Sequence, residues 1–518
     1  MVSIIPKPVN CVVGRGSFNL SSDVKIFAPK ECSSIVSLLN EWMRETLGFE
    51  FKEAFDSITN KGINLTLNEF LKNLGKEGYR LEINETLISV EGNALRGIFY
   101  GIQSLKQLFL EAKKNHSGKI QAQTIEDYPR FPWRGFMFDV GRHFHPAETV
   151  KKMLEILAFL KMNVLHFHFN EDQGWRIEIK KYPKLTEIGS KRKDTLIGSH
   201  ISKKYRGIPH EGYYTQDEVK EIVEYASKRY ISVVPELEIP GHSSAAIASY
   251  PELSCKDNQI EVRMRFGISP EIYCAGKEQT FQFLQDVLDE LMNLFPSEII
   301  HIGGDEAPKK RWKECEKCQE RITTEGLKDE KELQEYVTNR IAVYLKEKGK
   351  RIMGWNQILG DSLDKSAIAH YWFGKKSEMR KHLYERRDFV MSNMSRTYLD
   401  YNYLMFPLRR FYNFDPIPKD TDPEYYDNVL GLEAPLWTEW VPNLERLGWQ
   451  VFPRLIASAE VGWTQKKLMD YSDFKKRLPL ILSYLEIVGM PHASLDEVDP
   501  SNFNRFIRLY RWLRWPKI

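Results

Sequence analysis

The sequence predicts an α/β protein in which a (β/α)8 TIM barrel follows a smaller N-terminal α+β domain. Within residues 131–480, strand-like runs alternate repeatedly with helix-like segments, which is typical of a parallel sheet covered by its own helices. Residues 1–130 lack this alternation and contain the pattern of a hairpin. At 518 residues the chain is too long for one small domain, so two or three domains are expected.

The N-terminal domain, residues 1–130, is predicted from local patterns. Residues 22–27 are strand-like, residues 79–83 alternate in polarity, and residues 87–90 follow a polar turn, which indicates a hairpin. Asn93 is placed to cap the next helix. The apolar face of that helix is Leu95, Ile98, Phe99, Ile102 and Leu105. Prolines within residues 127–132 disfavour helix in the residues before them and predict a rigid linker.

Eight candidate strands build the predicted barrel, residues 131–480. They are residues 135–139, 164–169, 232–236, 298–302, 351–354, 367–371, 389–391 and 429–432. Amphipathic helices separate several of them, for example at residues 148–159 and 216–228. Residues 481–518 are helical in pattern, rich in aromatic side chains, and expected to pack on the barrel. A homodimer formed through this segment is an alternative.

Composition excludes several classes of function. The formal net charge of +3 and the lack of a long basic run argue against a nucleic-acid-binding protein. No run approaches the roughly 20 apolar residues of a membrane span. The N-terminus has no apolar signal segment, and the six cysteines are few and scattered. These features favour a reducing cytoplasmic location and no membrane partner.

The most informative motif is the end of the fourth strand. An apolar run, residues 299–302, is followed by two glycines and then by Asp305 and Glu306. Glycine lets a backbone turn sharply or pass close to a ligand. Adjacent carboxylates repel each other, which can hold one of them protonated near neutral pH, as a general acid requires. Because paired carboxylates usually cut glycosidic bonds, this motif favours a glycosidase.

Charged and aromatic residues also follow the other strands, at the end of a barrel where active sites form. They are Arg142 after the first strand, Glu171 and Asp172 after the second, Glu236, Glu238 and His242 after the third, Trp355 and Trp372 after the fifth and sixth, Tyr398 and Asp400 after the seventh, and Trp437 and Glu439 after the eighth. Aromatic faces pack on sugar rings, and charged side chains bind sugar hydroxyls. The set therefore indicates sugar recognition.

Four segments together resemble glycoside hydrolase family 20, the β-N-acetylhexosaminidases. They are His301 to Glu306, with its His-x-Gly-Gly-Asp-Glu pattern, and residues 135–144, 166–176 and 235–242, the last of which contains Pro-Gly-His. In this order and spacing the motifs are highly specific together. The resemblance covers nearly the whole chain, including an N-terminal α/β domain that members of the family commonly carry.

The resemblance implies an exo-acting, retaining enzyme that removes terminal N-acetylglucosamine, or N-acetylgalactosamine as a second candidate, from an oligosaccharide or glycoconjugate. Glu306 would be the general acid. Asp305 would orient the 2-acetamido group of the substrate, which attacks the anomeric carbon and forms an oxazolinium intermediate; the family is an exception to the two-carboxylate rule. The resemblance implies no cofactor and no metal.

Further roles carry over residue by residue. Tyr398 would donate a hydrogen bond to the acetamide oxygen, in a pocket walled by Trp355, Trp372 and Trp437. Arg142 and Glu439 would hold the outer hydroxyls, with Asp400 at the far edge of the sugar. His242 and Glu171 would form a pair that tunes Glu306.

Two positions depart from the family pattern. Glu171-Asp172 stands where the family usually has two aspartates, which puts the contact between Glu171 and His242 in question. Asn356-Gln357 stands where an Asp-Glu pair is common, which removes charge beside the pocket. The sequence does not give the direction of either effect.

Three other interpretations remain open. His166 and His168 share one face of a strand and, with His242 and Asp305, suggest a metal-dependent amidohydrolase, although that motif belongs on a first strand and satisfied core histidines are favoured. A non-catalytic sugar-binding barrel conflicts with the intact Asp305-Glu306 pair. Cys315-x-x-Cys318 resembles half a zinc site, but no second pair follows at a suitable spacing, which favours a structural role.

Overall fold

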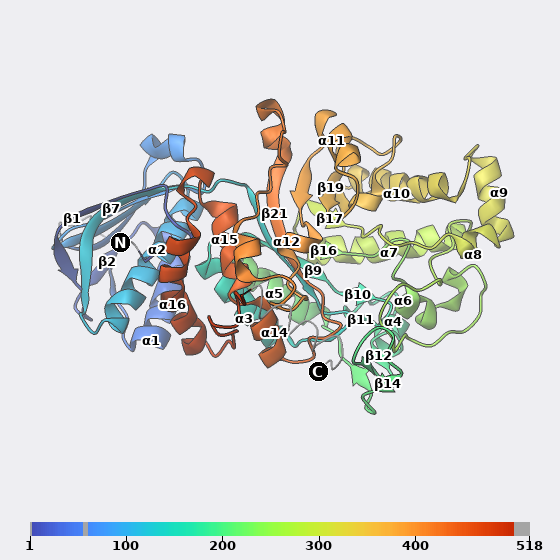
Figure 1. Ribbon diagram of the computed structural model, residues 1–518, viewed down its shortest axis with the longest axis horizontal. Helices are drawn as coiled ribbons and strands as arrows, with labels where there is room; N and C mark the ends of the chain where they lie inside the picture. The colour runs from blue at the N-terminus through green and yellow to red at the C-terminus, as the bar shows by residue number, and fades with distance from the viewer. Residues whose placement is uncertain (1–2, 55–60, 502–518) are drawn as a thin grey trace.

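The computed structural model describes residues 3–54 and 61–501. It consists of an N-terminal domain built on one open sheet and a closed barrel beside it, with helices between them (Figure 1). The predicted fold class is therefore confirmed. In the described part of the chain, no helix is both long enough and apolar enough to cross a membrane.

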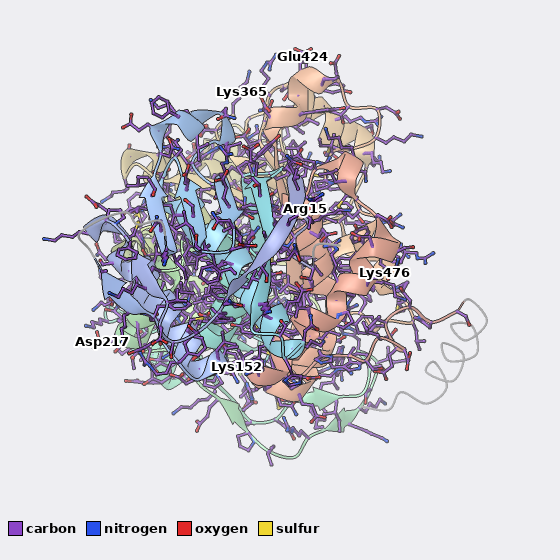
Figure 2. The ribbon with its side chains drawn as sticks, turned by 90° about the vertical axis from the view of Figure 1, so that its left-hand side faces the viewer. Arg15, Lys152, Asp217, Lys365, Glu424 and Lys476 are labelled. Carbon is purple, nitrogen blue, oxygen red and sulfur yellow. The ribbon has the colours of Figure 1, made fainter. Side chains whose placement is uncertain are left out.

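The N-terminal sheet has seven strands in the order β1-β7-β5-β6-β4-β2-β3. They are β1 (Asn10–Asn19), β2 (Lys25–Phe27), β3 (Lys52–Ala54), β4 (Gly62–Leu67), β5 (Tyr79–Ile83), β6 (Leu87–Gly92) and β7 (Lys119–Asp127), with helices α1 (Ser33–Leu47), α2 (Leu95–Lys114), η1 (Lys30–Cys32) and η2 (Glu69–Leu74). Strands β5 and β6 pair antiparallel, so the predicted hairpin is confirmed. Figure 2 looks onto this sheet, with Arg15 of β1 labelled.

Helix α2 buries the apolar face that the sequence predicts, but Asn93 does not cap it. The capping position is Ala94, whose backbone is extended and whose carbonyl accepts hydrogen bonds from the N–H groups of Gly97 and Ile98. Asn93 lies one residue too early, because strand β6 continues to Gly92 and the chain needs both Asn93 and Ala94 to turn into the helix. The prediction of this cap is wrong.

All eight predicted barrel strands are present and pair in parallel as one closed barrel. They are β8 (Trp133–Asp139), β9 (Val164–His168), β16 (Ser232–Glu236), β17 (Ile299–His301), β18 (Arg351–Trp355), β19 (Ile368–Tyr371), β20 (Phe389–Met391) and β21 (Val429–Leu436). The barrel closes where β21 pairs with β8, from Gly431 opposite Trp133 to Leu436 opposite Phe138. The carboxyl ends of all eight strands therefore meet at one rim.

Helices follow most of the strands on the outside of the barrel. They are α3 (Ala147–Phe159), α4 (Lys184–Glu187), α5 (Gln216–Ser227), α6 (Ser244–Ser249), α7 (Glu278–Leu294), α8 (Lys310–Lys313), α9 (Glu316–Thr324), α10 (Glu330–Glu347), α11 (Lys376–Tyr384), α12 (Met394–Thr397), α13 (Leu408–Tyr412), α14 (Leu444–Val451) and α15 (Arg454–Trp463). Only the short turn η4 (Asn356–Ile358) stands between β18 and β19. The fifth strand thus ends in a short connection directly at the rim.

Short elements fill the remaining connections. The connection after β9 carries three two-residue strand pairs, β10 (Asn170–Glu171) with β11 (Gly174–Trp175), β12 (Lys191–Arg192) with β15 (His210–Glu211), and β13 (Leu196–Ile197) with β14 (Lys204–Tyr205). Turns η3 (Pro251–Leu253), η5 (Pro423–Asn428) and η6 (Lys466–Leu468) lie in later connections. The hairpins after β9 cluster beside α4 and α6 (lower right in Figure 1).

The barrel interior is layered. One apolar cluster takes a side chain from each strand: Trp133, Val164, Val234, Ile299, Met353, Ile368, Val390 and Leu430. Nearer the carboxyl ends of the strands, the interior becomes polar. Glu236 there accepts hydrogen bonds from His168 and Trp355, and its carboxylate lies 2.7 Å from Nδ1 of His301. The apolar layer closes the barrel, and the polar layer supports the rim above it.

The two domains share a buried ion pair. Nζ of Lys161, which follows α3, lies 2.9 Å from Oδ2 of Asp127 at the end of β7, and neither side chain is exposed. Asp127 also accepts hydrogen bonds from the Tyr79 hydroxyl and the Trp463 indole N–H. The segment predicted as a linker is thus fixed at its first residue by charge and hydrogen bonds.

Helix α16 (Tyr471–Ile487) packs against α2 of the N-terminal domain and runs across residue 480, where the barrel was expected to end. It also contacts the barrel side of the molecule, where Tyr484 stacks on Phe159 of α3 and Arg477 bonds to Glu460 of α15 (Figure 1). Residues 506–512, the core of the predicted C-terminal helical segment, lie outside the described residues.

Candidate active site

The fourth barrel strand ends in a turn that only glycine fits. Gly303 and Gly304 have φ of 61° and 98°, in the left-handed region that side chains disfavour. A Cβ on Gly303 would lie 1.9 Å from Oε2 of Glu238. Glu306 also has a positive φ, 45°, which is uncommon outside glycine and often occurs at functional sites. This turn places Asp305 and Glu306 side by side at the rim.

The two adjacent carboxylates have different surroundings. Asp305 is 8% exposed, whereas the side chain of Glu306 is 35% exposed. Burial raises the pKa of Asp305 to about 6; the His242 cation opposes this rise, and the charge of Glu306 adds to it. One oxygen from each carboxylate and one nitrogen of His242 lie within 4.8 Å of one another. The repulsion between the two carboxylates, which the sequence predicts, thus contributes to the raised pKa of Asp305.

His242 links this pair to Glu171. Its Nδ1 lies 2.7 Å from Oε1 of Glu171, and its Nε2 lies 3.7 Å from Glu306 Oε2 and 4.0 Å from Asp305 Oδ2. Burial alone would lower the pKa of His242, but the charge of Glu171 and its hydrogen bond raise the pKa well above the usual value. The longer glutamate therefore reaches the histidine, and His242 is a cation beside both carboxylates.

Glu171 also binds Arg142, a contact that the sequence analysis did not foresee. Arg142 Nη2 lies 3.0 Å from Glu171 Oε1, and the guanidinium carbon lies 4.7 Å from the ring centroid of Trp437. Asp139, at the end of β8, accepts hydrogen bonds from the backbone N–H groups of Gly141 and Arg142. Asp139 thus fixes the backbone at Arg142, and the carboxylate of Glu171 lies between Arg142 and His242.

Four aromatic rings form a continuous row at the rim. Trp355 lies 5.7 Å from Trp437, Trp437 lies 6.3 Å from Tyr398, and Tyr398 stacks on Trp372 at 6.2 Å between ring centroids. Trp355 is buried and donates its indole N–H to Glu236 at 3.0 Å. The structure thus brings together the three tryptophans and the tyrosine that the sequence analysis selected.

Asn356 and Gln357, the second departure from the family pattern, hold Trp372. Asn356 Oδ1 accepts the backbone N–H of Trp372 at 3.0 Å, and Gln357 Oε1 accepts its indole N–H at 2.7 Å. Asn356 also donates its side-chain N–H to the carbonyl of Phe373 at 2.8 Å. Two uncharged amides thus orient Trp372, one of the four rings of the aromatic row. Sequence spacing does not reveal this role, because the contact joins the segment after β18 to the segment after β19.

Several polar atoms at the rim are buried and lack a protein partner within the described residues. They are Oδ1 of Asp305, Oδ1 of Asp400 and Oε2 of Glu238. Burial, followed by the charge of Glu439, raises the pKa of Asp400, and burial raises that of Glu238 as well. Glu439 is half-buried, and burial raises its pKa, although Arg142 opposes the rise. Unpaired buried oxygens are costly, so a polar ligand is the natural partner for this rim.

His166 and His168 have partners of their own. His166 Nδ1 lies 2.7 Å from Glu433 Oε1 and its Nε2 lies 3.1 Å from Glu236, while His168 binds Glu236 and contacts Arg142 Nη1 at 3.3 Å. Both are buried core histidines that contact carboxylates, as the sequence analysis favoured, although Nε2 of His166 makes no hydrogen bond within the described residues. Each histidine already contacts a carboxylate, Glu236 or Glu433, that is not part of the ligand set in the amidohydrolase interpretation.

An acid pair on a glycine turn, a cationic histidine and an aromatic row at the carboxyl rim of a parallel barrel define a (β/α)8 glycosidase. Within that class the chain belongs to glycosyl hydrolase family 20. Residues 131–466 match the catalytic domain of the family, and residues 1–128 match its domain 2. The chain is therefore a glycoside hydrolase, and the resemblance stated from its motifs is confirmed.

Relatives extend over most of the chain. A β-hexosaminidase of Porphyromonas gingivalis is 37% identical over 528 residues, which cover 98% of this chain and 66% of that protein. The GH20 exo-β-N-acetylglucosaminidase of Vibrio harveyi has a TM-score of 0.83 at 29% identity, covering 95% of this chain and 78% of that one. A β-N-acetylhexosaminidase of Bacteroides fragilis has a TM-score of 0.82 at 31% identity, covering 97% of this chain and 99% of that one.

Proposed function

We propose that the chain is an exo-acting, retaining β-N-acetylhexosaminidase that removes terminal N-acetylglucosamine, with N-acetylgalactosamine as a second candidate, from an oligosaccharide or glycoconjugate. The observation that carries the proposal is Asp305. Its carboxylate is buried, has an Oδ1 that no group in residues 3–54 and 61–501 pairs with, and adjoins Glu306 and the His242 cation. The related Vibrio harveyi structure is described as a complex with N-acetylglucosamine.

In the proposed first step, the acetamide oxygen of the substrate attacks its anomeric carbon while the bond to the leaving oxygen breaks. Glu306 gives its proton to that oxygen, and Asp305 stabilises the positive charge that develops at the acetamide nitrogen. The product is an oxazolinium ion and a released alcohol. In the second step Glu306 takes a proton from water, and the water oxygen attacks the anomeric carbon. The bond from that carbon to the acetamide oxygen breaks, so the oxazolinium ring opens and the sugar is released with its original anomeric configuration.

The surroundings of the two carboxylates support this division of roles. Asp305 is the more buried of the pair, so its charge is weakly screened and acts strongly on a nearby cation. Glu306 is more exposed, which lets it exchange protons with solvent and reach a leaving group of variable size. His242, held cationic by Glu171, balances the negative charge of both.

Exo action is proposed from the charged groups at the outer rim. Arg142 lies over Trp437, and Asp400 and Glu439 are half-buried carboxyl groups on the last two connections. A guanidinium and two carboxyl groups match the hydroxyls of a terminal sugar. We propose that they end the pocket after one sugar, with the acetamide group toward Trp355, Trp372 and Tyr398.

A pair of substrates tests the proposal directly. We expect an aryl N-acetyl-β-glucosaminide to be cleaved far faster than the matched aryl β-glucoside, because only the first carries the internal nucleophile. Proton NMR of the first product should show the β anomer. Equal cleavage of the two glycosides, or a product of inverted configuration, would contradict participation of the acetamide. Tight competitive inhibition by a thiazoline mimic of the cyclised intermediate should accompany the expected result.

A further inference from the structure

Four of the six cysteines converge at one point outside the active site. Sγ of Cys274 lies 3.6 Å from Sγ of Cys318 and 3.8 Å from that of Cys315, and Sγ of Cys255 lies 3.8 Å from that of Cys318. Taken together, the four sulfur atoms lie within 4.8 Å of one another. No second pair follows Cys315-x-x-Cys318 in the sequence, as the sequence analysis states, but Cys255 and Cys274, which precede it by 63 and 44 positions counted to Cys318, join it in space.

The sulfur spacing fits a single metal ion. With a Zn–S bond of about 2.3 Å, two sulfurs at neighbouring corners of a tetrahedron are about 3.8 Å apart. A disulfide needs about 2 Å, and all four thiols are free. Three of the four cysteines are buried, and Cys255 is half-buried. Such packing of four thiols is unusual for cysteines that serve only to fill a core.

The local fold brings the four thiols together from two connections at the rim. Cys255 and Cys274 belong to the connection after β16, where Ser254 and Tyr273 form a β-bridge and the Cys274 N–H bonds to the Leu253 carbonyl at 2.8 Å. Cys315 precedes helix α9 and Cys318 lies in its first turn. A Cys-x-x-Cys at such a turn is a common half of a four-cysteine site.

The backbone around the four thiols is closely packed and held in place. Gly276 packs so closely on the Lys317–Cys318 backbone that a Cβ there would meet the Lys317 carbonyl carbon at 2.3 Å. The buried ammonium of Lys277 binds the Ser254 carbonyl at 2.6 Å and pairs with Asp257. These contacts fix the backbone on both sides of Cys255, and groups that hold metal ligands in place strengthen a site.

We propose that Cys255, Cys274, Cys315 and Cys318 bind one zinc ion in a closed, structural four-cysteine site. Four thiolates in a tetrahedral arrangement are the ligand set that zinc prefers for a structural role. With all four positions taken by sulfur, the ion has no place for water or substrate. The site replaces our sequence-based expectation of no metal, and it does not depend on which sugar the enzyme hydrolyses.

The proposed ion joins the two connections that carry the acid machinery. The connection after β16 bears His242, and the Tyr273 N–H bonds to the Pro240 carbonyl at 3.1 Å, two residues before it. The connection after β17 bears Asp305 and continues to Trp312, whose indole N–H bonds to the Tyr273 carbonyl at 2.8 Å. Zinc at the far end of these connections would hold one against the other and so position His242 beside Asp305.

Metal analysis of the full-length protein, purified without chelator from zinc-supplemented cells, tests the proposal. We expect about one zinc per chain, with Cys255→Ser and Cys274→Ser each falling well below that value because a structural site needs all four ligands. The matched controls are Cys32→Ser, which removes a buried thiol outside the site, and Cys11→Ser, which removes a half-buried one. Both controls should keep the zinc of the unmodified chain.

Two further readouts separate zinc loss from misfolding. Cobalt exchanged into the site should show the intense sulfur-to-metal absorption of tetrahedral thiolate cobalt, absent in Cys255→Ser. Circular dichroism should show that this variant, with its half-buried ligand removed, retains secondary structure but melts at a lower temperature. Metal-free protein with four reactive thiols, two disulfides found by mass spectrometry, or stoichiometric iron in place of zinc would each overturn the proposal.

Discussion

Glu171 is the residue at which the outer rim and the acid pair meet. Its Oε1 lies 3.0 Å from Arg142 Nη2 and 2.7 Å from His242 Nδ1. Burial would raise the pKa of Glu171, but these two cations lower it well below the usual value. A carboxylate that serves two cations keeps both in fixed positions. The departure from the family pattern at this position therefore preserves the contact with His242.

The first prediction concerns the pH dependence of the proposed reaction. In the proposed mechanism Asp305 must be ionised, and burial raises its pKa to about 6. As pH falls below this value Asp305 gains a proton, so kcat/KM should fall about tenfold per pH unit on the acid side. The measurement is kcat/KM for an aryl N-acetylglucosaminide between pH 4 and pH 8. A profile that stays flat down to about pH 4.5 would remove Asp305 from this role.

Replacing Glu171 should move that acid limb to higher pH. In Glu171→Gln the buried His242 loses the largest charge that raises its pKa, so its pKa should fall and its cation should favour the ionised form of Asp305 less. Glu171 itself repels Asp305, but this effect is smaller than the attraction from His242. Glu221→Gln, which alters an exposed carboxylate paired with Lys151, is the matched control and should leave the limb in place. A limb that moves to lower pH would show that the repulsion dominates.

Glu306→Gln tests the general acid. An amide cannot give a proton to the leaving oxygen, so we expect a loss of roughly 10²–10⁴-fold in kcat with a poor leaving group. With a dinitrophenol leaving group, which departs without protonation, the first step should lose much less. Pre-steady-state release of the phenol separates this step from the second. Equal losses for both substrates would assign the acid to another residue.

At the scale of elements, the barrel strands were predictable and the contacts between connections were not. A parallel strand covered on both sides is a continuous apolar run, and all eight such runs became strands. The paired strands after β9 are only two residues long, so the sequence there shows no comparable hydrophobic periodicity. The cysteine cluster joins positions 63 apart, such as Cys255 and Cys318, and the hold of Gln357 on Trp372 crosses between strands. Such pairings depend on how connections lie in space.

The turn after β17 supplies the prediction at this scale. Gly303→Ala should lose more stability than Gly326→Ala, although both glycines have a φ near the same positive value, 61° and 66°. Both substitutions carry the cost of a side chain in the left-handed region, about 1–2 kcal/mol. Only at Gly303 does the new Cβ also meet the carboxylate of the buried Glu238, which would have to shift, whereas nothing lies within 4 Å of a Cβ at Gly326.

Denaturation midpoints and kcat/KM distinguish the two glycine variants. Gly303→Ala should lower both, since the turn also sets the position of Asp305, whereas Gly326→Ala should lower only the midpoint, and by less. Equal midpoints in the two variants would mean that the Glu238 side chain shifts at little cost to make room for the new Cβ. Unchanged kcat/KM in Gly303→Ala would separate the turn from the placement of the acid pair.

The whole molecule is held together by contacts that no local pattern contains. Asp127 pairs with Lys161, 34 positions away, and accepts the indole N–H of Trp463, 336 positions away. The sequence analysis placed Asp127 in a linker on the basis of the prolines that follow it. Prolines report local backbone preference, whereas the burial of Asp127 depends on where β7, α3 and α15 meet. Contacts between domains therefore do not follow from local sequence patterns.

Lys161→Met tests whether this pair couples the two domains. Removing one partner leaves the Asp127 charge buried with only neutral donors, the Tyr79 hydroxyl, the Trp463 indole and the Val9 N–H, so we expect a loss of about 3–5 kcal/mol. Urea denaturation followed by Trp fluorescence measures the loss, and Lys220→Met, which breaks the exposed pair with Asp217, should leave the midpoint nearly unchanged. Adding Asp127→Asn to Lys161→Met should recover part of the stability, because the uncompensated charge is then gone. If the double variant is less stable than the single one, the Asp127 charge stabilises the junction through Tyr79 and Trp463 even without the lysine, and the ion pair is not what joins the domains.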